Sequence, residues 1–154
     1  MKPSGILIVA ERPKLESNHT QPMVGTKSFN TLTQWLMDSK LIKDAEPSFT
    51  GEGITVLGQV TIINATDAFS GPPNAGDLAW VKENVDRAAI VVTLGSVAEE
   101  SALTVLSGQR RLYVPTLVSL PHPSGLNRAL NSAKVRKNVR QKLDYVKRLS
   151  EVSG

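Results

Sequence analysis

Short apolar runs bounded by polar residues constrain the fold of this 154-residue sequence more than any other feature. Ile6–Ala10 and Ala89–Leu94 are almost entirely apolar, and each is too short to form a buried helix. Runs of this length are typical of strands that are covered on both faces. Residues 54–63 and 114–120 are also strand-like, and Gly58 can divide the first of these segments in two.

Helical segments alternate with these strands. They cover residues 26–40, 77–88, 96–106 and 131–149, and the first, second and fourth have apolar residues at helical spacing. Residues 43–53 are expected to form a loop, and Ser96 with Glu99 fits a capping box at the start of the third helix. Because strands and helices alternate, the sequence predicts a single α/β domain over residues 1–154, with a parallel sheet and helices on both sides.

The composition excludes several classes of site. The chain has no cysteine, which rules out a disulfide scaffold, a cysteine-bound metal or iron–sulfur site and a cysteine nucleophile. It has only two histidines, so we expect neither a metal nor another cofactor. No apolar run approaches the roughly 20 residues of a membrane span, and the first apolar run is too short for a signal peptide. These features favour a monomeric cytoplasmic protein that contacts no membrane.

Basic residues concentrate at the carboxyl-terminal end of the chain. Residues 128–154 contain eight lysine or arginine residues and two acids, in a chain whose net charge is +4. A basic helix beside a near-neutral body can contact a polyanion such as DNA. The alternative is that these side chains only solvate the outer face of a helix whose inner face carries Val135, Val139, Leu143 and Val146.

Ligands of parallel sheets bind at the carboxyl ends of the strands. Three loops are expected to meet there: 11–25, 64–76 and 121–128. In the last of them, His122 stands between two prolines, which stiffen its backbone. The N–H groups of Ser124 and Gly125 can come close to a phosphate. Leu126 is apolar in a polar loop and is a candidate wedge for unstacking a DNA duplex.

The same loop resembles the second motif of the uracil-DNA glycosylase superfamily. His-Pro-Ser at 122–124 is similar to the form found in the uracil-DNA glycosylases. Pro-Ser-Gly-Leu-x-Arg at 123–128 is similar to the form found in the mismatch-specific uracil/thymine glycosylases.

Three further segments resemble the iron–sulfur-containing uracil-DNA glycosylases, in the same order along the chain. Val-Ala-Glu-Arg-Pro at 9–13, followed by Gln-Pro-Met-Val-Gly at 21–25, is similar to their first motif. Asn64 before Gly71-Pro-Pro73 is similar to their middle segment, and residues 90–98 to their strand-to-helix turn.

The resemblance implies a three-layer α/β/α fold with a central four-stranded parallel sheet, base flipping and hydrolysis of the N-glycosidic bond. Glu11 matches the acid that positions or activates water, Asn64 the amide that reads the base edge, and His122 the group that stabilises charge on the pyrimidine O2. Met23 matches the residue that stacks on the flipped base, and Leu126 the intercalating wedge. The expected contacts to the minor groove and phosphates of DNA are Ser124, Gly125, Leu126, Asn127, Arg128, Lys134, Arg136 and Lys137.

The sequence also departs from the family pattern. Without cysteine the iron–sulfur cluster cannot be bound, and Met23 stands where the related enzymes have a phenylalanine. Arg12 stands where they have a small or acidic residue. A guanidinium ~5 Å from the sugar would oppose the positive charge of the transition state by roughly 3 kcal/mol. We therefore expect Glu11, Asn64 and His122 to line one cleft, with Arg12 pointing out of it.

Each candidate residue also has a purely structural interpretation. Glu11 can pair with a neighbouring basic residue, Asn64 can end a strand, and Leu126 can anchor its loop in the core. Trp35 and Trp80 have core-like spacing and are interpreted as packing residues. The first hypothesis is a compact, metal-independent DNA glycosylase that acts on uracil or a modified pyrimidine. The alternatives are an inactive superfamily member that binds DNA or a nucleotide, and an enzyme for a hypermodified base of viral DNA.

Overall fold

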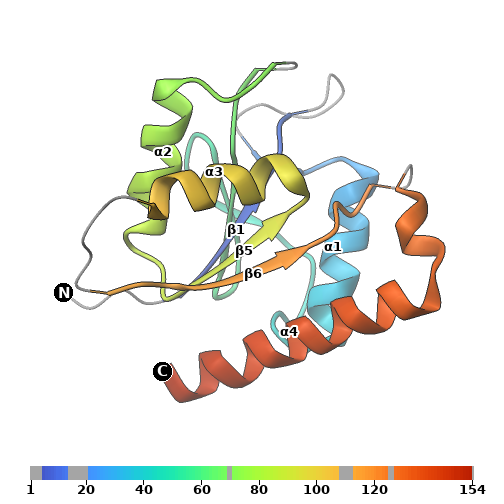
Figure 1. The fold of residues 1–154 in the computed structure, drawn as a ribbon. Helices are drawn as coiled ribbons and strands as arrows, with labels where there is room; N and C mark the ends of the chain where they lie inside the picture. The colour runs from blue at the N-terminus through green and yellow to red at the C-terminus, as the bar shows by residue number, and fades with distance from the viewer. Residues whose placement is uncertain (1–4, 14–20, 69–70, 108–112, 125–126, 154) are drawn as a thin grey trace.

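The computed structural model describes residues 5–13, 21–68, 71–107, 113–124 and 127–153. Strands and helices alternate along these residues (Figure 1). The strands are Ile6–Ala10 (β1), Ser48–Gly51 (β2), Ile54–Leu57 (β3), Val60–Asn64 (β4), Ile90–Leu94 (β5) and Thr116–Leu120 (β6). The helices are Lys27–Asp38 (α1), Ala75–Val85 (α2), Ser96–Leu106 (α3) and Ala133–Ser153 (α4), and the short 3-10 helix η1 covers Arg128–Asn131.

The strands form one sheet in the order β2-β3-β4-β1-β5-β6. Strands β4, β1, β5 and β6 are parallel, and Ile8 of β1 is level with Ile62 on one side and with Val92 on the other. This confirms the predicted four-stranded parallel sheet. Strands β2 and β3 extend it through antiparallel pairing.

The expectation of a loop over residues 43–53 is wrong, because β2 lies in its second half. The sequence of β2, Ser-Phe-Thr-Gly, has too few apolar residues to indicate a strand by itself. The division of residues 54–63 at Gly58 is confirmed. Gly58 has a φ of 58°, a left-handed conformation that glycine adopts without steric cost, and the chain reverses there between β3 and β4.

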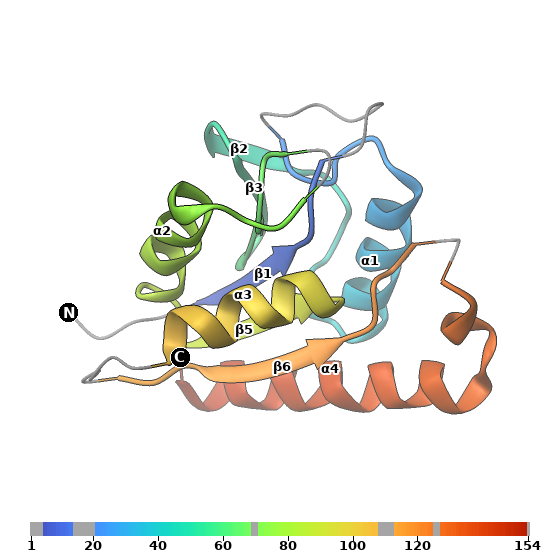
Figure 2. The same cartoon turned by 45° about the horizontal axis from the view of Figure 1, so that its top comes forward.

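Helices cover both faces of the sheet (Figures 1 and 2). On one face, Leu32 of α1 and Leu143 of α4 pack in a core that includes Ile8. On the other face, the core formed with α2 and α3 includes Val81 and Val9. Successive side chains of β1 point to opposite faces, so Ile8 and Val9 belong to different cores. This three-layer arrangement confirms the predicted fold class.

The helix starts differ in part from those predicted. Thr26 caps α1, and its side chain accepts a hydrogen bond from the third residue of the helix. The capping box predicted for Ser96 is wrong, because Ser96 is already the first helical residue and Gly95, which has no side chain, occupies the cap position. A capping box is found instead in α2, between Asn74 and Asp77.

Helix α4 is 21 residues long and begins after η1, at Ala133. Its predicted apolar stripe is confirmed in that Val139, Leu143 and Val146 are buried against the sheet and α1. Neither α4 nor any other helix within the described ranges is long and apolar enough to cross a membrane.

Candidate active site

The carboxyl edge of the parallel strands brings together residues that are far apart in the sequence. Glu11 directly follows β1, Asn64 is the last residue of β4, and His122 comes two residues after the end of β6. Ala10 and Asn64 are opposite each other in the β1–β4 pairing, so Glu11 begins its loop beside Asn64. Strand β1 has β4 on one side and β5 on the other, so the direction in which strands are added reverses there. Ligands of α/β sheets usually bind at such a switch point.

His122 is held in one orientation by its own loop. The backbone N–H of Ser124 donates to Nδ1 of His122 at 3.1 Å. Because Nδ1 accepts this bond, the proton of a neutral imidazole lies on Nε2. Nε2 is 3.9 Å from Oε2 of Glu11, so these two side chains face each other across the edge.

Gly95 allows the imidazole to lie close to the turn between β5 and α3. A Cβ atom added to Gly95 would be 3.3 Å from Cβ of His122 and 3.6 Å from its Cδ2. Gly95 also has a φ of 87° with a ψ of 176°, a region that is essentially restricted to glycine. Sequence reasoning gave this residue no role in the site. The signal that could have found it is a glycine directly between a buried strand and a helix.

Asn64 is buried at this edge without a full set of partners. The residue is 5% exposed, and its Oδ1 atom is buried and accepts no hydrogen bond. Ile62 belongs to the core beneath α1, and strand alternation puts Asn64, two residues later in β4, on that same face, although the residue also borders a cavity on the α2 side. The first residues of α1 border the cavity beside Glu11. A buried carbonyl oxygen without a donor is costly, and a ligand that donates a proton would satisfy it.

The expectation that Arg12 points out of the cleft is wrong. Its Nε atom is 3.3 Å from Oε1 of Glu11, and its Nη2 atom donates to the carbonyl of Gly71 at 2.9 Å. The side chain is 19% exposed, and Nη1 is buried without a partner. The guanidinium therefore lies between Glu11 and the loop after β4. The physical reason is that a carboxylate one residue away offers Arg12 a charge-assisted hydrogen bond inside a partly buried site.

The cavity between Glu11 and His122 measures only about 20 Å³, and Arg12 and Met23 also line it. This volume can hold a water molecule, whereas ligand pockets usually enclose roughly 300–1,000 Å³. Asn64 lines a separate cavity of about 660 Å³, next to the β2–β3 turn and α2. The expected single cleft is therefore divided, and the part that contains Glu11 and His122 is too small for a base.

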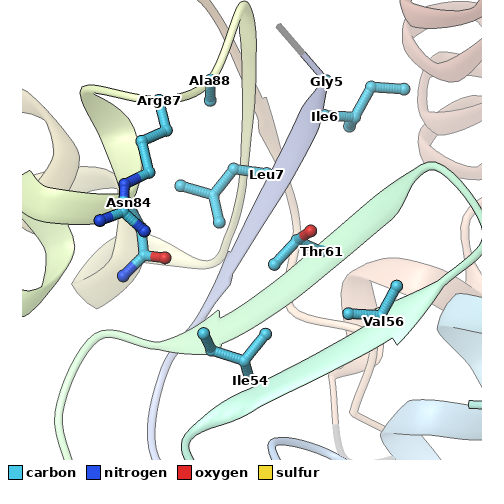
Figure 3. Close-up of a pocket in the computed structure, with 9 residues that line it drawn as sticks. All are labelled: Gly5, Ile6, Leu7, Ile54, Val56, Thr61, Asn84, Arg87 and Ala88. Atoms are coloured by element: carbon cyan, nitrogen blue, oxygen red, sulfur yellow. The ribbon is translucent and has the colours of Figure 1, made fainter. Parts of the chain in front are cut away.

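Another cavity, of about 290 Å³, lies at the opposite end of the sheet (Figure 3). Leu7 and Ile54 contribute apolar side chains to it, and Asn84 and Arg87 contribute polar ones. Asn84 donates to a carbonyl of α2 at 2.9 Å, and Arg87 pairs with a glutamate of the same helix at 3.2 Å. The described residues that line this cavity include no acid and no histidine, so it has no counterpart of the Glu11–His122 pair.

The loop after β6 uses several predicted DNA contacts for its own structure. The Asn127 side chain donates to the carbonyl of His122 at 3.0 Å and accepts from the backbone of Ala129 at 3.1 Å, so it holds the loop and caps η1. Arg128 is exposed at the start of η1. Gly125 and the predicted wedge Leu126 lie outside the described residues.

The basic residues of α4 divide into two groups. Lys134 and Lys137 are exposed, and so is Arg136, although its Nη1 atom donates to a carbonyl of η1 at 2.9 Å. Lys142 instead donates to a carbonyl of β6 at 2.7 Å, and Lys147 pairs with an acid one turn later in α4 at 3.4 Å. Most of the exposed positive charge of α4 is therefore in its first two turns, where Arg140 is also exposed, and Arg148 is exposed further along the helix.

The arrangement can do acid–base and hydrogen-bond chemistry at the carboxyl edge. A carboxylate faces an imidazole there, and an unsatisfied amide oxygen lies at the end of the neighbouring strand. Within the described ranges, no three histidine or acidic side chains are grouped closely enough to hold a metal ion.

The sequence matches the family described as "Uracil DNA glycosylase superfamily" over residues 2–149. The matched span covers nearly the whole chain and includes Glu11, Asn64 and His122. No curated protein matches the chain.

Proposed function

The chain belongs to the uracil DNA glycosylase superfamily, and on that premise we propose that it is a DNA glycosylase that needs no metal. It would flip a uracil-type or modified pyrimidine out of DNA and hydrolyse the bond between this base and its deoxyribose. The superfamily generally consists of hydrolytic DNA glycosylases, and its members bind DNA. The observation that carries the proposal for this chain is the Glu11–His122 pair, 3.9 Å apart at the switch point of the sheet.

The reaction needs groups that respond to opposite charges. As the bond from C1′ to the base nitrogen breaks, the sugar becomes positive and the base negative. Glu11 would stabilise the sugar cation and orient a water molecule whose oxygen bonds to C1′. The water gives up one proton to Glu11, and this proton then passes to the departing base. His122 supports this scheme because the Ser124 N–H donates to Nδ1, which places the proton of a neutral imidazole on Nε2, the atom that would donate to the pyrimidine O2.

Asn64 would select the base. An asparagine side chain can accept a hydrogen bond from a ring N–H and donate one to the neighbouring carbonyl of the same pyrimidine edge. The unsatisfied, buried Oδ1 atom supports this role, because a base that donates to it would remove the cost of leaving it unpaired.

Substrate binding would have to open the site. A cavity of about 20 Å³ cannot hold a pyrimidine ring, and the large side chains of Arg12 and Met23 are among those that border it. A DNA phosphate could draw the Arg12 guanidinium away from Glu11, since arginine binds phosphate in two-point hydrogen bonds. Exposed Arg128, Lys134 and Lys137 would hold the phosphates on either side.

The small volume of the cavity beside Glu11 favours a second candidate function. If Arg12 stays bound to Glu11 in the complex with DNA, the chain would be a superfamily member that binds DNA without removing a base. An enzyme that acts on a hypermodified pyrimidine would require the cavity to open further still.

An abasic-site cleavage assay tests the proposal. Oligonucleotides that carry U, U·G, T·G, hypoxanthine or 5-substituted pyrimidines are incubated with the protein as single strands and as duplexes. We expect base release from at least one substrate and a loss of roughly a hundredfold in Asn64→Ala. The matched control is Asn30→Ala, which alters an exposed asparagine on α1. DNA binding without release of any base would contradict the proposal and leave the binding function.

A further inference from the structure

We propose that the groove between α1 and α4 is a second nucleotide-binding site. The two helices cover the same face of the sheet with their axes crossing (Figures 1 and 2), and the groove between them has a volume of about 320 Å³. It shares no residue with the cavity of Glu11 and His122. The residues that would contact the nucleotide are Trp35, Ser39, Arg136, Val139, Arg140 and Leu143.

The apolar part of the groove suits the flat face of a base. Val139 and Leu143 are 2% and 1% exposed and form a floor that is already part of the core. Trp35 packs against the same core but is only partly buried, so part of its indole borders the groove. Stacking of a base on an aromatic side chain is worth about 1–3 kcal/mol, and it does not depend on which base is present.

The charged part suits a phosphate. Arg136 and Arg140 are one helical turn apart on α4, and both are exposed at the groove. The bond from Nη1 of Arg136 to the carbonyl of Leu130 orients that guanidinium without neutralising it. The one acid in the lining, Asp38, accepts a hydrogen bond from Gln34 at 2.8 Å. Two guanidinium groups against one carboxylate leave the groove positive, and arginine pairs readily with phosphate.

Ser39 supplies an independent observation. This residue ends α1, is 5% exposed and lines the groove, yet its hydroxyl is buried and makes no hydrogen bond. Buried hydroxyls in folded proteins nearly always have a partner, so an unpaired one calls for an explanation. The polar edge of a base, which carries both donors and acceptors, would provide the partner.

The volume and the chemistry together define the ligand class. A cavity of about 320 Å³ is at the lower end of the usual range for small-molecule sites and accommodates one nucleotide. This nucleotide could be free, or it could be an unpaired nucleotide of a strand that runs along the basic first turns of α4. The chemistry is the same in both cases. The inference does not require base removal, so it can fail or hold separately from the proposed glycosylase.

Tryptophan fluorescence can test this inference, because the chain has only two tryptophans. In Trp80→Phe the remaining signal comes from Trp35. Thymidine monophosphate and a single-stranded oligothymidylate are the probes, and we expect saturable quenching by at least one of them. Tighter binding of the oligonucleotide assigns the groove to a DNA strand, and equal or tighter binding of the monophosphate assigns it to a free nucleotide.

A pair of variants tests whether the quenching of Trp35 comes from binding in this groove. Arg136→Gln with Arg140→Gln should weaken the quenching at least tenfold, while Arg148→Gln, an exposed arginine further along α4, should leave it unchanged. A shift of the Trp35 indole N–H resonance in the unaltered chain gives a second readout that does not depend on the folding of any variant. No response of Trp35 to either probe, or a response that survives the double substitution, would overturn the inference.

Discussion

The two ends of the sheet differ in cavity volume and in whether their buried polar groups have hydrogen-bond partners. The cavity at the amino end measures about 290 Å³, and the polar side chains Asn84 and Arg87 that line it have partners in α2 (Figure 3). The cavity of Glu11 and His122 at the carboxyl end measures about 20 Å³. Of the three buried side-chain atoms without a partner in the described ranges, two belong to residues of the carboxyl end, Arg12 and Asn64.

This difference indicates that volume alone is a poor guide to function in this molecule. A cavity whose polar groups already have hydrogen-bond partners gains few new hydrogen bonds from a ligand. A small cavity beside unpaired polar atoms gains hydrogen bonds when a substrate enters it. Each variant at the carboxyl end is therefore best compared with a matched variant at the amino end of the sheet or at another site remote from the carboxyl edge.

The largest effect is expected for His122→Ala. The variant loses the Nε2–H donor that faces Glu11, so base release under single-turnover conditions should fall by roughly a hundredfold or more. DNA affinity should stay within about threefold, because phosphate contacts lie elsewhere. Thr61→Ala, which alters the cavity at the amino end, should leave the rate unchanged. An equal rate loss in both variants would remove the distinction between the two ends.

The second-largest loss of rate is expected for Gly95→Ala. The new Cβ atom would be 3.3 Å from Cβ of His122, and misplacement of a reacting group by about 1 Å can cost up to a hundredfold in rate. The backbone conformation of Gly95 should also cost about 1–3 kcal/mol in the free energy of unfolding, measured by urea denaturation. Gly58→Ala is the control for the rate, because Gly58 precedes β4 at the other end of the strand, also has a positive φ of 58°, and a Cβ atom there meets nothing within 4 Å. A fully active Gly95→Ala would show that the position of His122 does not matter.

Arg12→Ala should have a smaller effect, in the opposite direction. Without the guanidinium the Glu11 carboxylate loses its ion pair and the cavity enlarges, so the single-turnover rate at saturating DNA should rise about tenfold, which corresponds to about 1.4 kcal/mol. Arg87→Ala removes an arginine that is ion-paired at the other end and should not change the rate. A slower Arg12→Ala would mean that the ion pair supports catalysis rather than closing the site.

The smallest effect concerns the phosphates. Lys137→Ala should reduce the dependence of log affinity on log salt concentration by about 0.9, which is the contribution of one phosphate contact on duplex DNA. Lys147→Ala is the control, since Lys147 is already paired with Glu151. An identical salt dependence in the wild type and in Lys137→Ala would show that Lys137 is only solvated.

The sequence indicated those parts of the fold that depend on local pattern. β1 and β5 were predictable because nearly continuous apolar runs of five residues are typical of buried strands, and α1 because its apolar stripe has clear helical spacing. β2 was not predictable, because its pairing with β3 is created by the reversal at residues 52–53, where Gly53 has a φ of 77°, and not by its own residues. The capping box of Ser96 was misassigned because Gly95 has a backbone conformation that the residue pattern does not reveal.

In the candidate site too, features that depend on tertiary contacts were not predictable from the sequence. The positions of Glu11, Asn64 and His122 at one edge follow from the rule that parallel strands end on the same side. The direction of Arg12 does not follow, because it depends on the carbonyl of Gly71, 59 residues away in the sequence. The closeness of Gly95 to His122 is likewise a tertiary contact between two strand ends, and only the folded structure reveals it.

A crystal structure of the protein with a DNA duplex that carries 2′-fluoro-2′-deoxyuridine opposite guanine tests the central claim most directly. The fluorine disfavours the sugar cation and so slows hydrolysis, which keeps the base attached. The account predicts that the uracil lies outside the helix between Asn64 and His122, with Arg12 withdrawn from Glu11. A uracil that remains stacked in the duplex, with the Arg12–Glu11 ion pair intact, would contradict it.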